Sequence, residues 1–578
     1  MARAGYFDLS GGINWRDDNI AVNEVRDAKN LLWEGDHLSL RNGYEQRNAD
    51  LSAPTTDFTV IRALAQAYIK SATGIDEHFL FVGCSTDGTT VYDRIVPYHK
   101  SSIPGATSDA YTPVDTTGYH PAWTSGDPLQ IAVLDSKAYM AIGDDDPYCI
   151  YTTGTTWYCR ELPLCYTLND GSSTGANIIN NSTASEDAEW QGAKWVVAAE
   201  AEGQGYLFLG DERTAYFGLK AAGIDPSKDI DDATLANRIA GINGSWDVTQ
   251  YIPLNPGARI WKAVSIKKHI FLMGYEGVYR LYIRDFYGGD YDFERISGKG
   301  CWGGAIAHDK GLFYVGVDGI YANDTLMSYN VAKKTWDNIF SEHSNNPDNL
   351  KDSCFAYHDG LIYFSFPDST SGVVFLFDPD WIYTDGDESF APVWPQLYTD
   401  TGYNVRGFYD LQGYEEKLFG LSSKHNWELD HDTLDQHTTG SGLPINWYVR
   451  HGWIDQELPN IEKAYQKASI DITNGVAVGT TLGAYDLQLG FSVNYDTGVT
   501  QRGLTTAIDA SISSAGEHIQ KTLEIPLACG YVLDGNCGSV ELIGEASGMA
   551  TGGDMALNIW GWALQYQPRM GPYEEVTT

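Results

Sequence analysis

Short apolar runs bounded by polar positions recur along this chain, and several of them end at a glycine. The five clearest runs read FLFVG, AYMAIG, YLFLG, IFLMG and LFYVG, and they end at Gly83, Gly143, Gly210, Gly274 and Gly316. Two related runs without the final glycine, LIYFSF and KLFGL, begin at Leu361 and Lys417. Runs of this length, rich in aromatic and β-branched residues, predict buried β-strands. The chain is therefore expected to be all-β.

Partner strands follow several of these runs. GVYRLYIRD comes after Gly274, DGIYAND comes after Gly316, and GVVFLFDPD occupies residues 372–380. Each repeat then supplies a few antiparallel strands, and the glycine-ended runs recur at intervals of 42 to 67 residues. Repetition near this spacing is typical of β-propeller blades. We expect an irregular β-propeller of about six or seven blades over residues 51–438.

The pattern changes after about residue 440, where the glycine-ended runs stop and the apolar stretches lengthen. Five stretches are predicted to be strands, at residues 445–455, 467–472, 486–496, 519–527 and 555–568. Their number and alternation favour a β-sandwich. A second domain is therefore expected over residues 439–578.

The first 50 residues are predicted to form a strand and hairpin segment that packs on the propeller or on a neighbouring subunit. The stretch NEVRDAKN resembles a short helix, a tight turn follows at Gly35 and Asp36, and an alternating strand comes next. In that strand Leu38 and Leu40 are expected to point inward, with Ser39 and Arg41 pointing outward.

Two inserts interrupt the repeats. Residues 169–190 are polar and predict a long exposed loop. A second insert covers residues 220–245, and within it residues 231–241 predict a short helix with an acidic start and a glycine stop.

Composition supports a large protein without long helices. The chain has 578 residues, of which 43% are hydrophobic and 13% aromatic, and its formal net charge is -39. This charge argues against tight binding to nucleic-acid phosphates, which requires cationic side chains at the contact. A surface of like sign instead repels DNA and lets it pass without binding, although simple solubility is the commoner reason for such charge.

The eight cysteines are scattered and form no C-x-x-C pair. They indicate neither a disulfide framework nor a zinc site, so buried free thiols are expected. The N-terminus lacks the apolar stretch of a secretory signal, and no later run is long enough to suggest a membrane span. We therefore expect synthesis in a cytoplasm and no membrane span.

Candidate metal ligands are few. His425, His431 and His437 lie six residues apart among aspartates, but this spacing fits neither a helix nor a zinc finger, and a solvated loop is the favoured interpretation. The acidic stretches at residues 143–147 and 378–388 carry enough oxygens for calcium. Aspartate is also common in turns, so no metal ligand is assigned.

Catalytic motifs such as H-E-x-x-H, G-x-S-x-G and the P-loop are absent from the sequence. Paired carboxylates for glycoside hydrolysis cannot be chosen from sequence in so acidic a chain. Residues 85–92 and 152–158 are interpreted as β-turns, and Trp157 and Trp381 either stack on sugars or pack in the core. No catalytic residue and no cofactor are predicted, and the protein is not expected to be an enzyme.

The N-terminal stretch LSGGINWRDDNIAVNEVRDAKNLLWEGDHLSLRNGYEQ resembles the N-termini of tailed-bacteriophage structural proteins. The matching positions are Gly11, Gly12, Asn23, Glu24, Ala28, Asn30, Arg41 and Gly43. Residues 262–324 are similar to the central blades of phage tail nozzle or hub proteins, also called packaged-DNA stabilisation proteins. There the resemblance rests on the GxGC turn at Gly298–Cys301 and on the strand Asp318–Tyr321.

This resemblance implies a virion structural protein that assembles with copies of itself into a ring, a hexamer, in the tail. Such a ring retains the packaged genome and forms the conduit through which DNA leaves without sequence-specific binding. Its other partners would be tail, portal-adaptor or fibre proteins, and the family implies no catalytic residues. Two alternatives remain open: a collar or tail-fibre-attachment adaptor, and a propeller that binds or depolymerises glycans.

Overall fold

The structure is a computed structural model of the whole chain. It describes residues 3–7, 10–14, 23–41, 43–46, 58–71, 74, 76–86, 94–100, 112–114, 121, 123, 127–134, 136–143, 147–153, 156–161, 164–167, 176–179, 193–201, 204–218, 251–254, 257–266, 268–285, 290–309, 311–323, 328–335, 347–366, 373–381, 383–385, 388–397, 405–411, 417–422, 425–429, 435–436, 442–443, 445–453, 460–474, 486–493, 508–509, 518–524, 533–535, 537–545 and 557–569.

Six four-stranded antiparallel sheets follow one another through the described part of the chain. The first three are β6 (Phe58–Lys70), β7 (Asp76–Thr86), β8 (Arg94–Lys100) and β9 (Thr112–Pro113); β10 (Gln130–Leu134), β11 (Lys137–Ala141), β12 (Tyr148–Thr153) and β13 (Thr156–Glu161); and β16 (Trp195–Ala201), β17 (Gln204–Gly210), β18 (Thr214–Gly218) and β19 (Tyr251–Pro253).

The next three are β20 (Ile260–Ile266), β21 (His269–Gly274), β22 (Gly277–Asp285) and β23 (Asp290–Ser297); β24 (Ala305–His308), β25 (Gly311–Gly316), β26 (Gly319–Asn323) and β27 (Ser328–Asn330); and β28 (Cys354–His358), β29 (Leu361–Ser365), β30 (Val373–Phe377) and β33 (Trp394–Leu397). Two small hairpins pair β14 (Leu164–Thr167) with β15 (Ala176–Ile179) and β31 (Tyr383–Asp385) with β32 (Glu388–Phe390). A 3-10 helix, η1, spans Pro347–Asp352.

A further sheet combines strands from both ends of the chain. It contains β34 (Gly407–Leu411), β35 (Lys417–Ser422) and β36 (His425–Leu429), and the N-terminal strand β5 (Tyr44–Gln46) pairs antiparallel with β36. The short strands β37 (Asp435–Gln436) and β38 (Gly442–Leu443) extend it. An early segment of the chain thus supplies the fourth strand of the last sheet.

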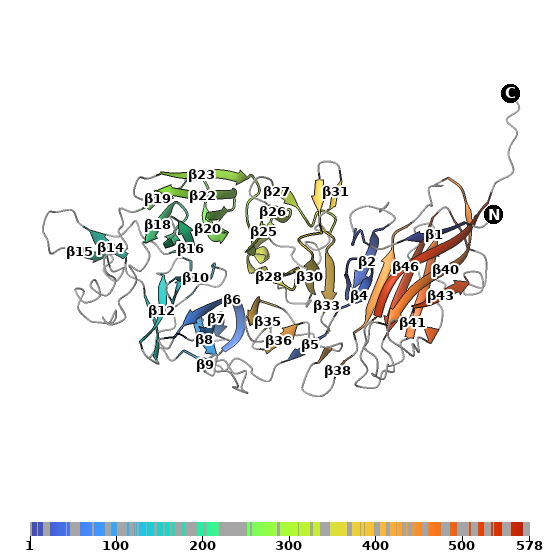
Figure 1. The fold of residues 1–578 in the computed structure, drawn as a ribbon, viewed down its shortest axis with the longest axis horizontal. Helices are drawn as coiled ribbons and strands as arrows, with labels where there is room; N and C mark the ends of the chain where they lie inside the picture. The colour runs from blue at the N-terminus through green and yellow to red at the C-terminus, as the bar shows by residue number, and fades with distance from the viewer. Residues whose placement is uncertain are drawn as a thin grey trace, which may run out of the picture.

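These seven sheets are arranged in a ring (Figure 1). The first strand of each sheet contacts the first strand of the next, from β6 through β10, β16, β20, β24 and β28 to β34, and β34 in turn contacts β6. The described chain is therefore all-β, with small antiparallel sheets in a β-propeller-like arrangement.

The apolar runs of the sequence correspond to the second strands of the sheets. The seven runs fall in or end just after β7, β11, β17, β21, β25, β29 and β35, so their prediction as strands is confirmed. These strands are buried on both faces because neighbouring sheets cover them. At Gly274 a side chain is excluded, since a Cβ there would lie 1.8 Å from the carbonyl oxygen of Ala258.

Each pair of neighbouring sheets encloses its own hydrophobic cluster. Phe79 and Phe81 of β7, for example, pack with Met140 of β11 and Ile150 of β12. Comparable clusters lie between the other neighbouring sheets, including one between β34–β36 and β6–β8 that joins the two ends of the ring. Burial of apolar area between sheets is the main force that holds the ring closed.

The C-terminal region forms two further sheets with strands from the N-terminus. The seven-stranded sheet contains β1 (Arg3–Phe7), β3 (Leu31–Trp33), β4 (Leu38–Leu40), β40 (Lys463–Asn474), β43 (His518–Glu524), β44 (Leu533–Gly535) and β46 (Leu557–Pro568). The five-stranded sheet contains β2 (Val25–Lys29), β39 (Trp447–His451), β41 (Asp486–Val493), β42 (Ile508–Asp509) and β45 (Gly538–Glu545). All five C-terminal stretches predicted as strands contain strands.

The two C-terminal sheets share one hydrophobic core. It combines Leu31 and Leu38 from the N-terminal strands with Trp447, Ile470 and Trp562 from the C-terminal strands. The first 46 residues thus contribute to this core and, through β5, to the ring (Figure 1).

The helix-like interpretation of residues 23–30 is wrong, because Val25–Lys29 form strand β2. A register shift between Val25 and Asp27, where β2 pairs with β39, moves the buried positions to Val25 and Ala28. A spacing of three between buried residues is also the spacing of a helix face, so this β-bulge explains the misreading.

The two inserts are only partly described. Residues 176–179 of the first form β15, whereas the predicted helix at residues 231–241 and the rest of the second insert lie outside the described residues. Within the described ranges, no helix has the length and hydropathy needed to span a membrane.

Cysteine burial leads to a prediction about thiol reactivity. Six cysteines are described, all are free, and five of them are buried, as the sequence predicts. Burial raises the pKa of Cys301 to about 11, so at pH 8 its thiol stays protonated, whereas the thiolate is the reactive form. Iodoacetamide at pH 8 is therefore expected to leave Cys301 unmodified in the native protein and to alkylate it in urea, as peptide mass spectrometry would measure. Equal rates of Cys301 alkylation in the native protein and in urea would contradict this burial.

Candidate functional site

A pocket of about 600 Å³ lies between the N-terminal hairpin β3–β4 and the sheet β28–β33. Sixteen residues line it: Leu32, Trp33, Glu34, Gly35, Ser39, Leu40, Arg41, Asp359, Leu361, Tyr363, Leu376, Asp378, Trp381, Pro392, Trp394 and Gln396. Its two walls come from segments more than 300 residues apart in the chain. The pocket exists only because the N-terminal segment packs against this sheet.

The hairpin wall depends on a tight turn between β3 and β4. Gly35 has a φ of 87°, a left-handed conformation that glycine adopts readily, and the Glu34 amide donates to the carbonyl oxygen of His37 over 2.9 Å. This confirms the turn predicted at Gly35 and Asp36. It leaves Glu34 exposed at the edge of the pocket.

The outward orientation expected for Ser39 and Arg41 is corrected by the structure. Leu38 and Leu40 are buried as predicted, but Ser39 and Arg41 are also buried, with exposures of 7% and 5%. Both side chains line the pocket and form hydrogen bonds within the N-terminal segment, Ser39 Oγ to Glu34 Oε1 and Arg41 Nε to Asn30 Oδ1. Alternation in the sequence separates the two faces of the strand but cannot reveal that the second face is also buried in the folded chain.

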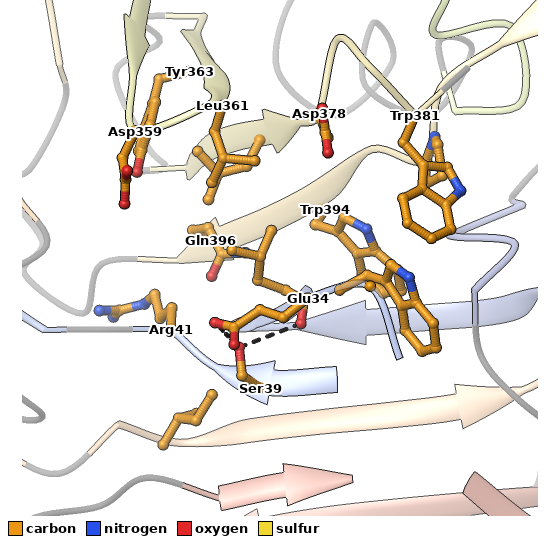
Figure 2. Close-up of a pocket in the computed structure, with 16 residues that line it drawn as sticks. Glu34, Ser39, Arg41, Asp359, Leu361, Tyr363, Asp378, Trp381, Trp394 and Gln396 are labelled. Atoms are coloured by element: carbon orange, nitrogen blue, oxygen red, sulfur yellow. Dashed lines mark hydrogen bonds between the residues drawn. The ribbon is translucent and has the colours of Figure 1, made fainter. Parts of the chain in front are cut away.

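The opposite wall is shaped by two aspartate turns. Asp359 and Gly360 have φ values of 46° and 82° at the turn between β28 and β29, as a tight Asp-Gly hairpin turn requires. After β30 the carboxylate of Asp378 accepts from the amide of Asp380 over 2.8 Å, and its carbonyl oxygen accepts from the amide of Trp381 over 3.2 Å. These turns hold Asp359, Asp378 and Trp381 at the pocket (Figure 2).

Aromatic side chains form one side of the pocket. The rings of Trp33 and Trp381 meet edge to face, with centroids 6.4 Å apart, and both side chains are half-buried. Trp394 lies behind them and is 2% exposed, because it also belongs to the hydrophobic core of the C-terminal sheets. The indole surfaces thus join that core to the pocket.

Polar groups occupy the floor. Ser39 Oγ donates to Glu34 Oε1 over 2.7 Å, and Gln396 Nε2 donates to the carbonyl oxygen of Leu31 over 2.8 Å. Gln396 is fully buried, yet its Oε1 has no hydrogen-bond partner among the described residues, and the same holds for Trp33 Nε1. The Gln396 side chain thus extends from β33 to the backbone of β3 (Figure 2).

Charge in the pocket is mainly negative. Among the described residues that line it, Glu34, Asp359 and Asp378 carry carboxylates and only Arg41 is basic. The Arg41 guanidinium is already engaged, since its Nε donates to Asn30 Oδ1 over 3.1 Å.

The charge of Arg41 also affects Lys29, which lies outside the pocket lining. Burial, and then the nearby charge of Arg41, lower the pKa of the Lys29 side chain.

The structure places the sequence candidates unequally. Trp381 and Asp378 line the pocket, whereas Trp157 is 7% exposed and donates through Nε1 to Glu77 Oε2 over 3.0 Å. Most of the stretch 152–158, predicted as a β-turn, is strand: residues 152 and 153 end β12, residues 156–158 belong to β13, and residues 154 and 155 lie outside the described part.

The proposed metal ligands are scarcely described. His425 opens β36, but its side chain, like His431, His437 and residues 144–146, lies outside the described part. Among the described side chains, no three His, Cys, Asp or Glu residues come together.

Sequence reasoning missed Trp33, Asp359 and Gln396 as pocket residues. The Asp-Gly pair at 359–360 is a recognisable turn signal, and it was available in the sequence. The neighbouring sequence does not distinguish Trp33 or Gln396 from core residues of a strand. They line a pocket only because the hairpin β3–β4 and the sheet β28–β33 lie against each other.

No protein-family model matches the sequence, and no curated protein matches it. The structure is distantly similar to β-propeller proteins. The AfRom2 CNH domain is 9% identical with a TM-score of 0.31, and the match covers 67% of this chain and 99% of that one. A Trypanosoma rangeli sialidase carrying a 2,3-difluorosialic acid covalent intermediate is 10% identical with a TM-score of 0.28, over 94% of this chain and 97% of that one. The same sialidase with sialic acid is 9% identical with a TM-score of 0.26, over 93% and 97%.

Proposed function

We propose that this chain is a virion structural protein of a tailed phage, a subunit of a tail nozzle or hub ring. In this proposal the seven sheets are the blades of a closed propeller and the two C-terminal sheets form a β-sandwich. The observation that carries it is the N-terminal segment, which completes the last blade through β5 and the sandwich through β1–β4. One segment therefore connects the ring to the C-terminal sheets, as expected of a structural subunit that must keep its shape within an assembly.

The residues behind the phage resemblance support this proposal because they have structural roles in that connection. The Asn14 side-chain amide donates to Glu24 Oε2 over 2.9 Å, and Glu24 also pairs with Lys334 beyond β27. Asn30 donates through Nδ2 to the carbonyl oxygen of Asn446 over 2.7 Å, and its amide donates to the carbonyl oxygen of Pro395 over 3.1 Å. The matching N-terminal positions thus bind the segment to both parts.

The central motif positions have comparable roles between two sheets of the ring. Cys301 donates through its amide to the carbonyl oxygen of Gly274 over 3.0 Å, which joins the GxGC turn to β21. The Tyr321 hydroxyl donates to the carboxylate of Asp318 over 2.7 Å at the start of the DG-aromatic strand. These motif positions therefore support the proposal through contacts that hold neighbouring strands together.

The acidic composition is compatible with a DNA conduit. A formal charge of -39 repels the phosphate backbone, so DNA moving past many copies of this chain would not be retained by ion pairs. The proposed location is the virion tail, after synthesis in the host cytoplasm, with portal-adaptor or fibre proteins as neighbours.

The proposal is tested by the symmetry of the protein in assembled particles. Purified virions containing a tagged copy are expected to show the tag in a closed ring on the tail axis, a hexamer, in averaged electron micrographs. Tag density that projects away from the axis would instead identify a collar or fibre adaptor. Particles without any symmetric position for the chain, or a chain absent from virions, would overturn the proposal.

A further inference from the structure

We propose that Lys262 is a nucleophilic amine, the site at which this chain forms an imine with a small aldehyde. Lys262 lies on β20, the first strand of its sheet, and the first strands of the seven sheets contact one another around the ring. The inference concerns the inside of one copy of the chain. It therefore goes beyond the assembly role proposed above and does not depend on it.

The surroundings of Lys262 contain no partner for an ammonium group. Among the described residues, no carboxylate pairs with its Nζ and no oxygen accepts a hydrogen bond from it. The titratable groups that act on it are the thiols of Cys301 and Cys354. Cys301 precedes β24 and Cys354 opens β28, the first strands of the next two sheets. Lys262 thus has thiols rather than carboxylates as its titratable neighbours.

These two thiols supply no negative charge at neutral pH. Burial raises the pKa of Cys301 to about 11 and the pKa of Cys354 to about 12, so both thiols stay protonated. The carboxylate that acts on Cys354, that of Asp352, already pairs with Arg406 Nη1 over 3.3 Å. A protonated Lys262 would therefore be a poorly hydrated cation without a counter-charge, which is unfavourable.

Contact with an indole offsets this cost only slightly. Lys262 Nζ lies 5.7 Å from the centroid of the Trp261 ring, and Trp261 Nε1 donates to the carbonyl oxygen of Cys301 over 2.9 Å. A cation–π contact at this distance is weak compared with the hydration that a surrounded ammonium group loses. Burial therefore lowers the pKa of Lys262, and a larger fraction of this amine is neutral at pH 7.

The amine remains accessible to a small reagent. The Lys262 side chain is partly exposed, and its Nζ is not among the described polar atoms that are both covered and unpaired. Since Nζ lacks a partner, it therefore keeps contact with solvent. A small uncharged aldehyde can reach such an atom without a basic side chain to bind it.

The reaction requires only the neutral amine and the aldehyde. The nitrogen lone pair adds to the carbonyl carbon and forms a C–N bond, and the carbonyl oxygen then leaves as water with the two protons of the nitrogen. The product is an imine, in which a C=N bond replaces the C=O bond. An ammonium group has no lone pair, so the rate rises with the fraction of neutral amine.

The experiment treats the full chain with acetaldehyde and sodium cyanoborohydride, which reduces the imine to a stable secondary amine, and follows each lysine by peptide mass spectrometry. The matched control is Lys268, which is exposed in the turn between β20 and β21 of the same sheet. At pH 7 Lys262 is expected to react at least about tenfold faster than Lys268, because each unit by which a pKa falls gives about ten times more neutral amine. At pH 10 this ratio is expected to fall, because well-hydrated lysines then also become neutral.

Two variants assign the reaction to its residue. Lys262→Met replaces the amine with an apolar chain of similar shape and is expected to abolish the fast modification at pH 7. Lys268→Met is expected to leave that modification unchanged, and circular dichroism shows whether each variant is folded. The rates of the two lysines are compared in the unmodified sequence, so the test holds even where Lys262→Met does not fold.

Either of two results would overturn the proposal. Lys262 could react no faster than Lys268 at pH 7, or the ratio of the two rates could stay the same at pH 10. The electron-microscopy test of the ring uses virions and is independent of both, so either proposal can fail without the other.

Discussion

A chain that lacks residues 1–46 is expected to lose its cooperative fold. The deletion removes β1–β4 from the two C-terminal sheets and β5 from the last sheet of the ring. Val25, Leu31, Leu38 and Leu40 are at most 6% exposed, and burial of such side chains stabilises by about 2 kcal/mol each, or roughly 8 kcal/mol together. This is comparable to the whole stability of a typical domain, about 5–15 kcal/mol.

The measurement is circular dichroism and thermal unfolding of the truncated chain, before and after addition of a peptide with the sequence of residues 1–46. We expect an aggregating or partly unfolded chain that regains β-structure with this peptide and not with a scrambled peptide of the same composition. A truncated chain that unfolds at the same temperature as the full chain would contradict the role given to the segment.

The Gly300→Ala variant is expected to destabilise the protein by roughly 3 kcal/mol, in the upper range for inserting a methyl group where there is no space. A Cβ at this position would lie 1.8 Å from the carbonyl oxygen of Tyr275, and this atom belongs to the backbone. The turn cannot easily shift, because Cys301 donates to Gly274 and Trp261 Nε1 donates to the carbonyl oxygen of Cys301 over 2.9 Å.

The control for this variant lies in the same GxGC turn. A Cβ added to Gly298 would have its nearest neighbour, Arg295 Nη2, at 3.8 Å, and Gly298 has no left-handed φ. Gly298→Ala is therefore expected to stay within about 0.5 kcal/mol of the unmodified protein. Urea midpoints of the two variants test this difference. Similar midpoints for Gly300→Ala and Gly298→Ala would show that the close approach at Gly300 is not a constraint.

Much of the ring could be predicted from the sequence, because its strands carry a local signal. A second strand such as β21 is covered on both faces, so its sequence is a continuous apolar run. The run ends at Gly274, where the backbone of Ala258 comes too close for a side chain. The signal weakens where a bulge changes the spacing of buried residues, as it does at Val25 and Ala28 in the stretch that resembles a short helix.

The candidate site was predicted only in part. Trp381 and Asp378 were singled out for their chemistry, and both line the pocket. Ser39 and Arg41 were assigned to an outward face, but both are buried and line the pocket. Gln396 carried no signal, because its unpaired oxygen is a property of the folded surroundings.

The sequence by itself determined the strands, their turns and the change of pattern near residue 440, because hydrophobic alternation, glycine and aspartate act within a few residues. Only the tertiary structure decided that β5 pairs with β36, that β1–β4 join the C-terminal sheets, and that Trp33 contacts Trp381 at one side of a pocket. Those contacts join residues hundreds of positions apart. These contacts form because the whole chain together buries a large apolar area, and the size of that area cannot be calculated from any short stretch of sequence.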